Sequence, residues 1–152
     1  MLSTSSRGSI GELKVCIDLM KKGWTVFQPI VDDISCDLIA IKDNIIKTIQ
    51  VKSHSTSHNK SKTSITIDLR SKNRKKKKNT VNEFKNFQKV ACGNIDIIAV
   101  LMKIKKFKIN TVIYIPTKEI KDLKCVAIAF TEALSGQKRK RREYQNYLNV
   151  PI

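Results

Sequence analysis

Two apolar runs joined by a very short polar turn constrain this chain more than any other feature. Residues 36–41 and 45–51 are rich in Ile, Leu and Val, and Lys42-Asp43-Asn44 stands between them. β-Branched runs on either side of a two-residue Asp-Asn turn are typical of a β-hairpin. Apolar residues point to both faces of this hairpin, so we expect it to be mostly buried in a sheet.

The length of the turn also sets the register of the two strands. If Asp43 and Asn44 form the turn, Lys42 opposes Ile45 and Asp37 opposes Gln50. Directly opposed residues have Cβ atoms ~4.5–5.5 Å apart, so both side-chain oxygens could reach one divalent ion. Lys52 projects from the same face as Gln50 because side chains alternate along a strand, and a longer loop would destroy this convergence.

A carboxylate, an amide and an ammonium group in one place suit phosphodiester hydrolysis. A hard cation such as Mg²⁺ takes oxygen ligands and needs only one or two carboxylates from the protein. It polarises the phosphate and acidifies a bound water, and a nearby Lys offsets the charge that grows on the phosphate oxygens. Glu12, in a predicted helix, could add an oxygen. The plain alternative is a surface salt bridge from Asp37 to Lys52, beside an ordinary polar Gln50.

The rest of the chain predicts one α/β domain without internal repeats. A first helix begins after the possible N-caps in Ser3–Ser6, carries Ile10, Leu13, Ile17 and Met20 at helical spacing, and ends at Gly23. We expect further strands over residues 24–28, 64–69, 95–102 and 109–115, a weaker helix over 81–92, and a C-terminal helix over 131–148. Trp24 and the late strands are predicted to be core.

The cysteines, histidines and hydropathy exclude several classes of protein. The four cysteines are widely spaced, so we expect small buried apolar residues in a reducing compartment rather than disulfides. His54 and His58 have a zinc-binding spacing if helical, but their Ser, Lys and Asn neighbours indicate a loop. No apolar run approaches the ~18 residues of a membrane span, and the N-terminal residues are polar. A soluble, cytoplasmic protein is expected.

The charge points to a polyanionic partner. Thirty Lys and Arg against thirteen Asp and Glu give the 152-residue chain a net charge of +17. Nucleic acid is the first candidate and an anionic membrane surface the second. Two segments concentrate the charge, a basic arm at 70–78 and a C-terminal segment at 131–152, and each could instead be plainly solvated; the second could also be a nuclear-targeting signal. The predicted DNA-binding residues are Arg70, Lys72, Arg74, Lys75, Lys76, Lys77, Lys78, Lys138, Arg139, Lys140, Arg141 and Arg142.

Four short segments together resemble the PD-(D/E)XK nuclease superfamily. They are Gly8-x-x-Gly11-Glu12, Gly23-Trp24, Asp37-Leu38-Ile39-Ala40 and Ile49-Gln50-Val51-Lys52. The resemblance continues through Asp96–Val100 and Tyr114-Ile115-Pro116, and so covers roughly residues 5–120. Gln50 departs from the acid that most members have at the second metal position. In this respect the chain is similar to the bacterial group I intron homing endonucleases built on this fold.

The resemblance implies a restriction-endonuclease-like α/β core, with a mixed sheet flanked by helices, in a single nuclease domain spanning residues 1–152. It implies site-specific cleavage of double-stranded DNA with Mg²⁺ or Mn²⁺, by a homo-oligomer that is at least a dimer and, in that branch, a tetramer. Metal ligation by Asp37, Gln50, Val51 and Glu12, and catalytic help from Lys52, are also implied. The same fold serves Holliday-junction resolvases and restriction-like nucleases, and a DNA-binding protein without catalysis is a further alternative.

Overall fold

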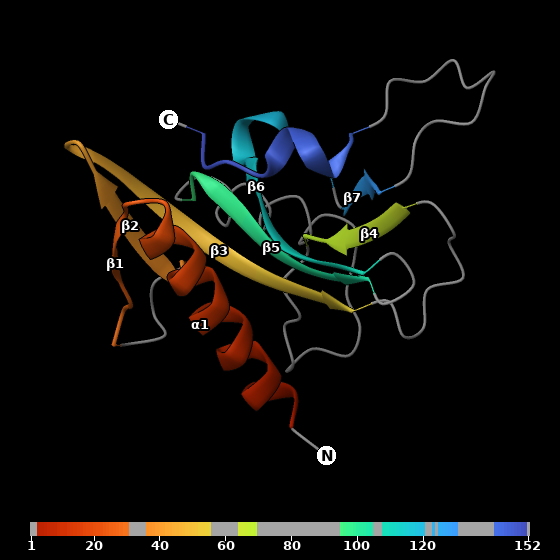
Figure 1. The fold of residues 1–152 in the computed structure, drawn as a ribbon, viewed down its shortest axis with the longest axis horizontal. Helices are drawn as coiled ribbons and strands as arrows, with labels where there is room; N and C mark the ends of the chain where they lie inside the picture. The colour runs from red at the N-terminus through yellow and green to blue at the C-terminus, as the bar shows by residue number, and fades with distance from the viewer. Residues whose placement is uncertain are drawn as a thin grey trace, which may run out of the picture.

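The computed structural model describes residues 3–30, 36–55, 64–69, 95–104, 108–120, 123, 125–130 and 142–151. These residues form three layers, which are a helix, a central sheet of five strands and a smaller sheet of two strands (Figure 1). The mixed α/β architecture is as predicted, with one α-helix among the described residues. The helix is α1 (Thr4–Lys21), and the strands are β1 (Thr25–Phe27), β2 (Leu38–Lys42), β3 (Ile45–Ser55), β4 (Ser64–Asp68), β5 (Ile97–Ile104), β6 (Ile109–Pro116) and β7 (Cys125–Ala129).

The central sheet has the strand order β1-β2-β3-β5-β6. Adjacent strands in this sheet run antiparallel, except for β3 and β5, which run parallel. The chain therefore crosses over between β3 and β5, and β4 lies in this excursion. β4 pairs with β7 in the separate two-stranded sheet rather than with the central one.

Both ends of α1 are capped as the sequence predicts. The Ser3 hydroxyl accepts a hydrogen bond from the backbone N–H of Ser6 at 3.0 Å. At the other end, Gly23 has φ +81° and its N–H donates to Met20, while the N–H of Trp24 donates to Leu19. These are the two bonds of a Schellman motif, in which glycine supplies the left-handed residue. The helix therefore stops where the chain turns into β1.

The face that α1 buries is not the one with the most prominent apolar spacing. Val15 and Leu19 are fully buried, whereas Ile10, Leu13, Ile17 and Met20 are 40, 57, 53 and 63% exposed. Gly11 explains the choice, because a Cβ atom built there would lie 2.1 Å from the Ser53 hydroxyl oxygen. The side of the helix without a side chain can approach β3 closely, so that side faces the sheet.

The hairpin has the predicted two-residue turn. Lys42 pairs with Ile45 and Leu38 with Ile49, as a turn at Asp43-Asn44 requires. Asp43 and Asn44 have φ values of 48° and 64°, the left-handed conformation of a type I′ turn. β1 extends this antiparallel pair on its outer side, and the chain leaves the sheet before Pro29.

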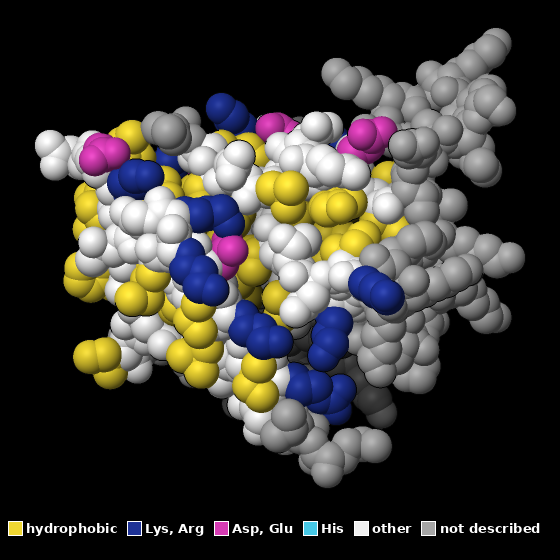
Figure 2. Space-filling view, in the orientation of Figure 1, with side chains coloured by type: hydrophobic (Ala, Val, Ile, Leu, Met, Phe, Trp, Pro, Cys, Tyr) yellow, Lys and Arg dark blue, Asp and Glu magenta, His cyan; other side chains and the backbone are white. Residues whose placement is uncertain are grey.

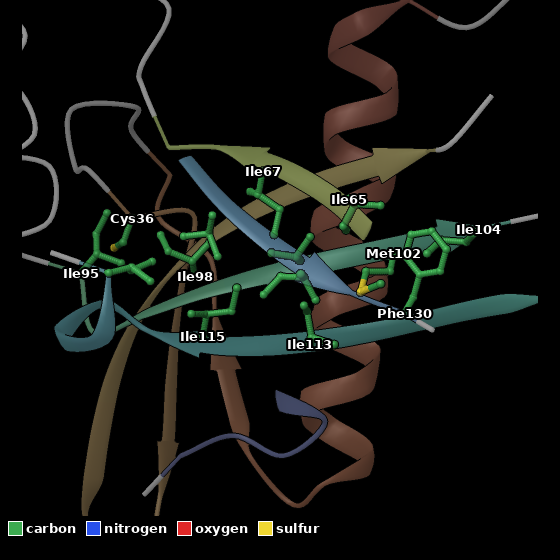
Figure 3. Packing of buried hydrophobic residues seen from close by; sticks show 14 residues of the cluster. Cys36, Ile65, Ile67, Ile95, Ile98, Met102, Ile104, Ile113, Ile115 and Phe130 are labelled. Carbon is green, nitrogen blue, oxygen red and sulfur yellow. The ribbon is translucent and has the colours of Figure 1, made fainter. Parts of the chain in front are cut away.

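The two faces of the central sheet have separate cores. One contains Val15 and Leu19 of α1, Trp24 and the helix-facing residues of the strands, which confirms Trp24 as core. On the other face, Ile65 and Ile67 of β4 pack over Ile98 and Ile113 (Figure 3). The late strands are therefore buried on both sides, as their continuous runs of β-branched residues predict.

Several sequence-based predictions were wrong. Cys36 is buried and Cys16 half-buried, but Cys125 is exposed on β7, because it lies at the first position of a strand whose alternate residues face solvent. The described part of the predicted C-terminal helix contains no α-helix. Glu143 instead forms an isolated parallel β-bridge with Ala129, the last residue of β7. Residues Tyr144–Tyr147 form a 3₁₀ helix. The loop predicted around His54 and His58 begins after His54, since β3 continues through Ser55.

Other predictions fall on residues that the structure does not describe. They are the basic arm at 70–78, the helix at 81–92, His58, Cys92, and the predicted DNA-binding residues at 138–141. Within the described ranges, no helix has the length and hydropathy needed to cross a membrane.

Candidate active site

The candidate site lies where β3 runs on beyond the start of β2. The paired register of β2 and β3 begins at Leu38 and Ile49, and Asp37 precedes it. The N–H of Asp37 donates to the carbonyl of Ile49 at 2.9 Å, which keeps Asp37 against β3. Past this point β3 has β5 on one side, where Gln50 pairs with Ile98, and among the described residues β2 does not continue on the other side. An edge of β3 is thus left beside Asp37.

The side chain of Asp37 occupies this edge. Its Oδ2 accepts a hydrogen bond from the backbone N–H of Val51 at 2.6 Å, and a second from the Nε2 of Gln50. On this side of β3, the carboxylate of Asp37 is the acceptor for the N–H of Val51. The register argument predicts that Asp37 and Gln50 meet, and the structure brings them into contact.

Val51 adds a backbone oxygen to the same edge. The N–H and C=O of one residue in a strand point to the same side. Since the Val51 N–H points at Asp37, its carbonyl projects from the edge of β3 that Asp37 covers. A carboxylate, an amide and a peptide carbonyl thus lie together, and all three offer oxygen ligands.

Lys52 lies on the strand face of Gln50. Gln50 pairs with Ile98 and Lys52 with Val100, two residues on, so both side chains leave β3 on the side away from α1. Lys52 is half-buried. The predicted alternation along β3 is correct, and it puts an ammonium group next along the strand from the Asp37–Gln50 contact.

Glu12 lies on α1, which packs on the face of the sheet opposite to the side chains of Gln50 and Lys52, and it has a partner on the β1 side. Its carboxylate accepts a hydrogen bond from the Nε2 of Gln28, at 3.2 Å, just beyond β1. Over the described ranges, no three His, Cys, Asp or Glu side chains gather where they could hold a metal ion. Any ion bound at Asp37 would therefore depend on amide, peptide or water oxygens as well as carboxylates. A role for Glu12 remains a prediction.

Cys36, next to Asp37, is a buried free cysteine. Burial raises the pKa of its thiol, and the charge of Asp37 adds to the effect, although a hydrogen bond with its own backbone opposes it. The thiol therefore stays protonated at neutral pH. The donors at this site are hard oxygen atoms.

A clamp that the sequence analysis missed holds β3 to β5 beside the site. Asp96 Oδ2 accepts hydrogen bonds from the N–H and the hydroxyl of Thr48, at 2.9 and 3.0 Å. The N–H of Asp96 in turn donates to the carbonyl and hydroxyl oxygens of Thr48. The carbonyl of Asp96 accepts hydrogen bonds from the N–H and the hydroxyl of Thr117. Thr48 lies two residues before Gln50 on the same strand face. The only signal was an acid before an apolar strand, and the sequence analysis assigned that segment to the core.

Of the predicted DNA-binding residues, the structure describes only Arg142, which is half-buried near the bridge from Glu143 to Ala129. The other eleven lie outside the described residues. Their contribution is not visible in the fold and stays a prediction.

Comparison with known proteins gives one family and a shared fold. The family model for PD-(D/E)XK endonucleases matches residues 2–148. Among solved structures, the bacterial homing endonuclease I-Ssp6803I superimposes with a TM-score of 0.61 at 19% identity, over 96% of this chain and 88% of that one. The Holliday junction resolvase Hjc of Archaeoglobus fulgidus has a TM-score of 0.41 at 16% identity, over 74% of each chain. None of the curated proteins matches the sequence.

Proposed function

We propose that this chain, which belongs to the PD-(D/E)XK endonuclease family, is a site-specific endonuclease that cleaves double-stranded DNA with a divalent cation. The observation that carries the proposal is the contact of Asp37 with Gln50 and Val51, with Lys52 next along the same strand. A net charge of +17 supports a polyanionic substrate.

The donors at the site fit Mg²⁺ or Mn²⁺. Both ions prefer oxygen ligands and keep several waters, so Asp37, Gln50 and the Val51 carbonyl would suffice as the protein's share, with Glu12 as a further candidate. In the structure Gln50 turns its Nε2 toward Asp37. A half-turn of the amide about its last bond would present Oε1 to a cation instead, without moving the strand.

Each residue has a definite task in this reaction. A bound ion would polarise the scissile phosphate and lower the pKa of a water ligand. Asp37 is oriented by the Val51 N–H, which fixes the direction of its carboxylate. Lys52 would stabilise the negative charge that develops on the phosphate oxygens, because its side chain leaves β3 on the same face as that of Gln50.

The proposed enzyme would recognise a long site in duplex DNA. This part of the proposal is supported by the likeness in fold to a protein that is described as a bacterial homing endonuclease. Residues 1–152 would act as one nuclease domain, and a domain of this length spans about 40 Å, or some ten base pairs. Since one active site cuts one strand, double-strand cleavage is most simply made by a two-fold dimer, and a longer site would need a tetramer.

Plasmid cleavage tests the proposal. A plasmid library of genomic fragments from the source organism is incubated with protein and Mg²⁺, and linearised molecules are sequenced at their ends. We expect cleavage at one recurrent sequence, no cleavage in EDTA, and a loss of at least about 100-fold in rate for Lys52→Ala. Lys47→Ala is the matched control, because Lys47 lies on the same strand but pairs with Ala40 and projects from the opposite face.

The other outcomes identify the alternatives. Cleavage in EDTA, or by Lys52→Ala at the wild-type rate, contradicts the mechanism. Cutting of four-way junctions with little regard for sequence would identify a junction resolvase. Tight DNA binding without any cleavage would leave a binding protein.

A further inference from the structure

Helix α1 has two apolar faces, and the fold covers only one of them. Gly11, Val15 and Leu19 face the sheet, at intervals of four residues. Ile10, Leu13, Ile17 and Met20 form a second set, here called the outer stripe. At 100° per residue, the centres of the two sets lie about 180° apart on the helix. A helix that is apolar on both faces is normally covered on both.

The outer stripe is exposed along its whole length. Its residues are 40, 57, 53 and 63% accessible, in chain order. At roughly 200 Å² for a fully exposed large apolar residue, they present about 400 Å² in total. In Figure 2, hydrophobic side chains gather along one flank of the region that α1 crosses, while Lys and Arg gather along the other.

The spacing of the outer stripe matches a helix partner. Its members are separated by three, four and three residues, which are the a and d positions of a heptad repeat. The stripe extends for about 15 Å along the helix. A seam of this kind packs against an identical seam around a two-fold axis, because the same patch then serves both partners.

We infer that the outer stripe of α1 binds the outer stripe of a second copy of this chain. A standard interface takes about 800 Å² from each partner, so the stripe would supply about half. The aliphatic parts of Lys14 and Lys21, both exposed beside it, can extend the apolar contact. A phosphate backbone does not fit this stripe, since its four side chains carry no charge and no donor.

Only the expectation of two active sites in one assembly rests on the proposed function. The association itself follows from the surface of α1. α1 packs against the face of the sheet opposite to the side chains of Gln50 and Lys52, so pairing through its outer stripe does not cover these two side chains.

Sedimentation of DNA-free full-length protein tests the inference. We expect wild type to sediment as a dimer or larger, and the double variant Leu13→Glu, Ile17→Glu to sediment as a monomer with an unchanged circular dichroism spectrum. Leu13→Lys, Ile17→Lys should do the same, because either sign of charge disrupts an apolar contact. Ile46→Glu is the matched control, as Ile46 is 62% exposed on β3, away from the stripe; this variant should assemble like wild type.

Every other result has a defined meaning. A monomeric wild type, a stripe variant that still assembles, or equal dissociation by Ile46→Glu overturns the inference. If the charged pair fails to fold, Leu13→Ser, Ile17→Ser should still raise the dissociation constant at least about tenfold. Stripe variants that lose DNA affinity while wild type is a monomer would assign this face to DNA. Assembly without cleavage refutes the proposed function alone, and cleavage by a monomer refutes this inference alone.

Discussion

Gln50 is the residue that separates this site from one built on two acids. In the structure it donates a hydrogen bond to Asp37, which a second carboxylate could not do. A neutral amide therefore leaves Asp37 stably placed without a cation, and it leaves the site with one negative charge fewer when a cation is present. We therefore expect a site that is formed before the cation binds and that binds the cation less tightly than two acids would.

The replacement Gln50→Glu should strengthen cation binding and make the cation-free site less stable. The added charge should lower the Mg²⁺ concentration for half-maximal binding about tenfold, since opposite charges at contact distance are worth on the order of 1 kcal/mol or more. In EDTA the same variant should melt at a lower temperature than wild type, because two carboxylates then repel. Calorimetric titration and thermal melts with and without Mg²⁺ measure both effects. Full cleavage activity in Gln50→Ala would show that Gln50 is not a ligand.

Tyr114 joins β6 to α1 through a largely buried polar contact. Its hydroxyl donates to Asp18 Oδ2 at 2.6 Å, and Lys22 pairs with the same carboxylate and lies 5.2 Å from the ring centre. Burial raises the pKa of Tyr114, and the hydrogen bond to Asp18 raises it further. The folded chain thus keeps the phenol protonated at pH values where the unfolded chain loses its proton.

This shift predicts a pH dependence with a definite sign. The stabilisation is complete below the unfolded pKa of about 10 and is lost as pH rises from there toward the folded pKa. At pH 7, Tyr114→Phe should cost about 1 kcal/mol, because Asp18 retains Lys22 as a partner. The difference from wild type should shrink above pH 10, as urea unfolding between pH 7 and 11 would show. A constant difference would mean that the hydroxyl is not involved.

At the scale of elements, the β2–β3 turn controls the site from a distance. Both turn residues have positive φ, and the register they impose places Asp37 at Gln50. Asn44→Gly should therefore stabilise the fold by about 0.5–1 kcal/mol, while Asn44→Val should cost about 1–2 kcal/mol. Urea midpoints measure the change. The same pair of replacements at Thr111, inside β6, should give the opposite order, because Val suits a strand and Gly weakens it.

The sequence alone was sufficient to predict those elements that are determined by residues close together in the chain. The hairpin register, the end of α1 at Gly23 and the alternation of Gln50 with Lys52 follow from turn length, glycine and strand geometry. The buried face of α1 did not follow from periodicity, because two apolar faces compete and the close approach of Gly11 to Ser53 is a tertiary contact. For the same reason, the pairing of β4 with β7 and the clamp from Asp96 to Thr48 could not be predicted, since each joins residues distant in the chain.

At the scale of the molecule, much of the positive charge lies in two basic segments of the sequence that fall mostly outside the described residues. The two basic segments together hold twelve Lys and Arg side chains, and the structure describes only Arg142 among them. The described residues instead carry the candidate site, with the side chains of Gln50 and Lys52 on one face of the sheet and α1 on the other. Substrate affinity and chemistry are therefore expected to depend on different parts of the chain and to be separable by mutation.

The salt dependence of DNA affinity measures how many of these positive charges contact phosphates. If six to ten cations contact phosphates, affinity should fall by about 10³–10⁵ between 50 and 200 mM salt, since each contact adds about −0.9 to the slope of log K against log salt concentration. Replacing Lys75–Lys78 with Ala should make the slope less steep by about 3–4 if the basic arm lies on the phosphates. A solvated arm predicts an unchanged slope. Fluorescence anisotropy with a catalytically inactive Asp37→Asn background gives the slope without cleavage, and Lys47→Ala serves as the control for loss of one charge elsewhere. A parallel loss of affinity at every salt concentration, with the slope intact, would place the arm's role in folding rather than in phosphate contact.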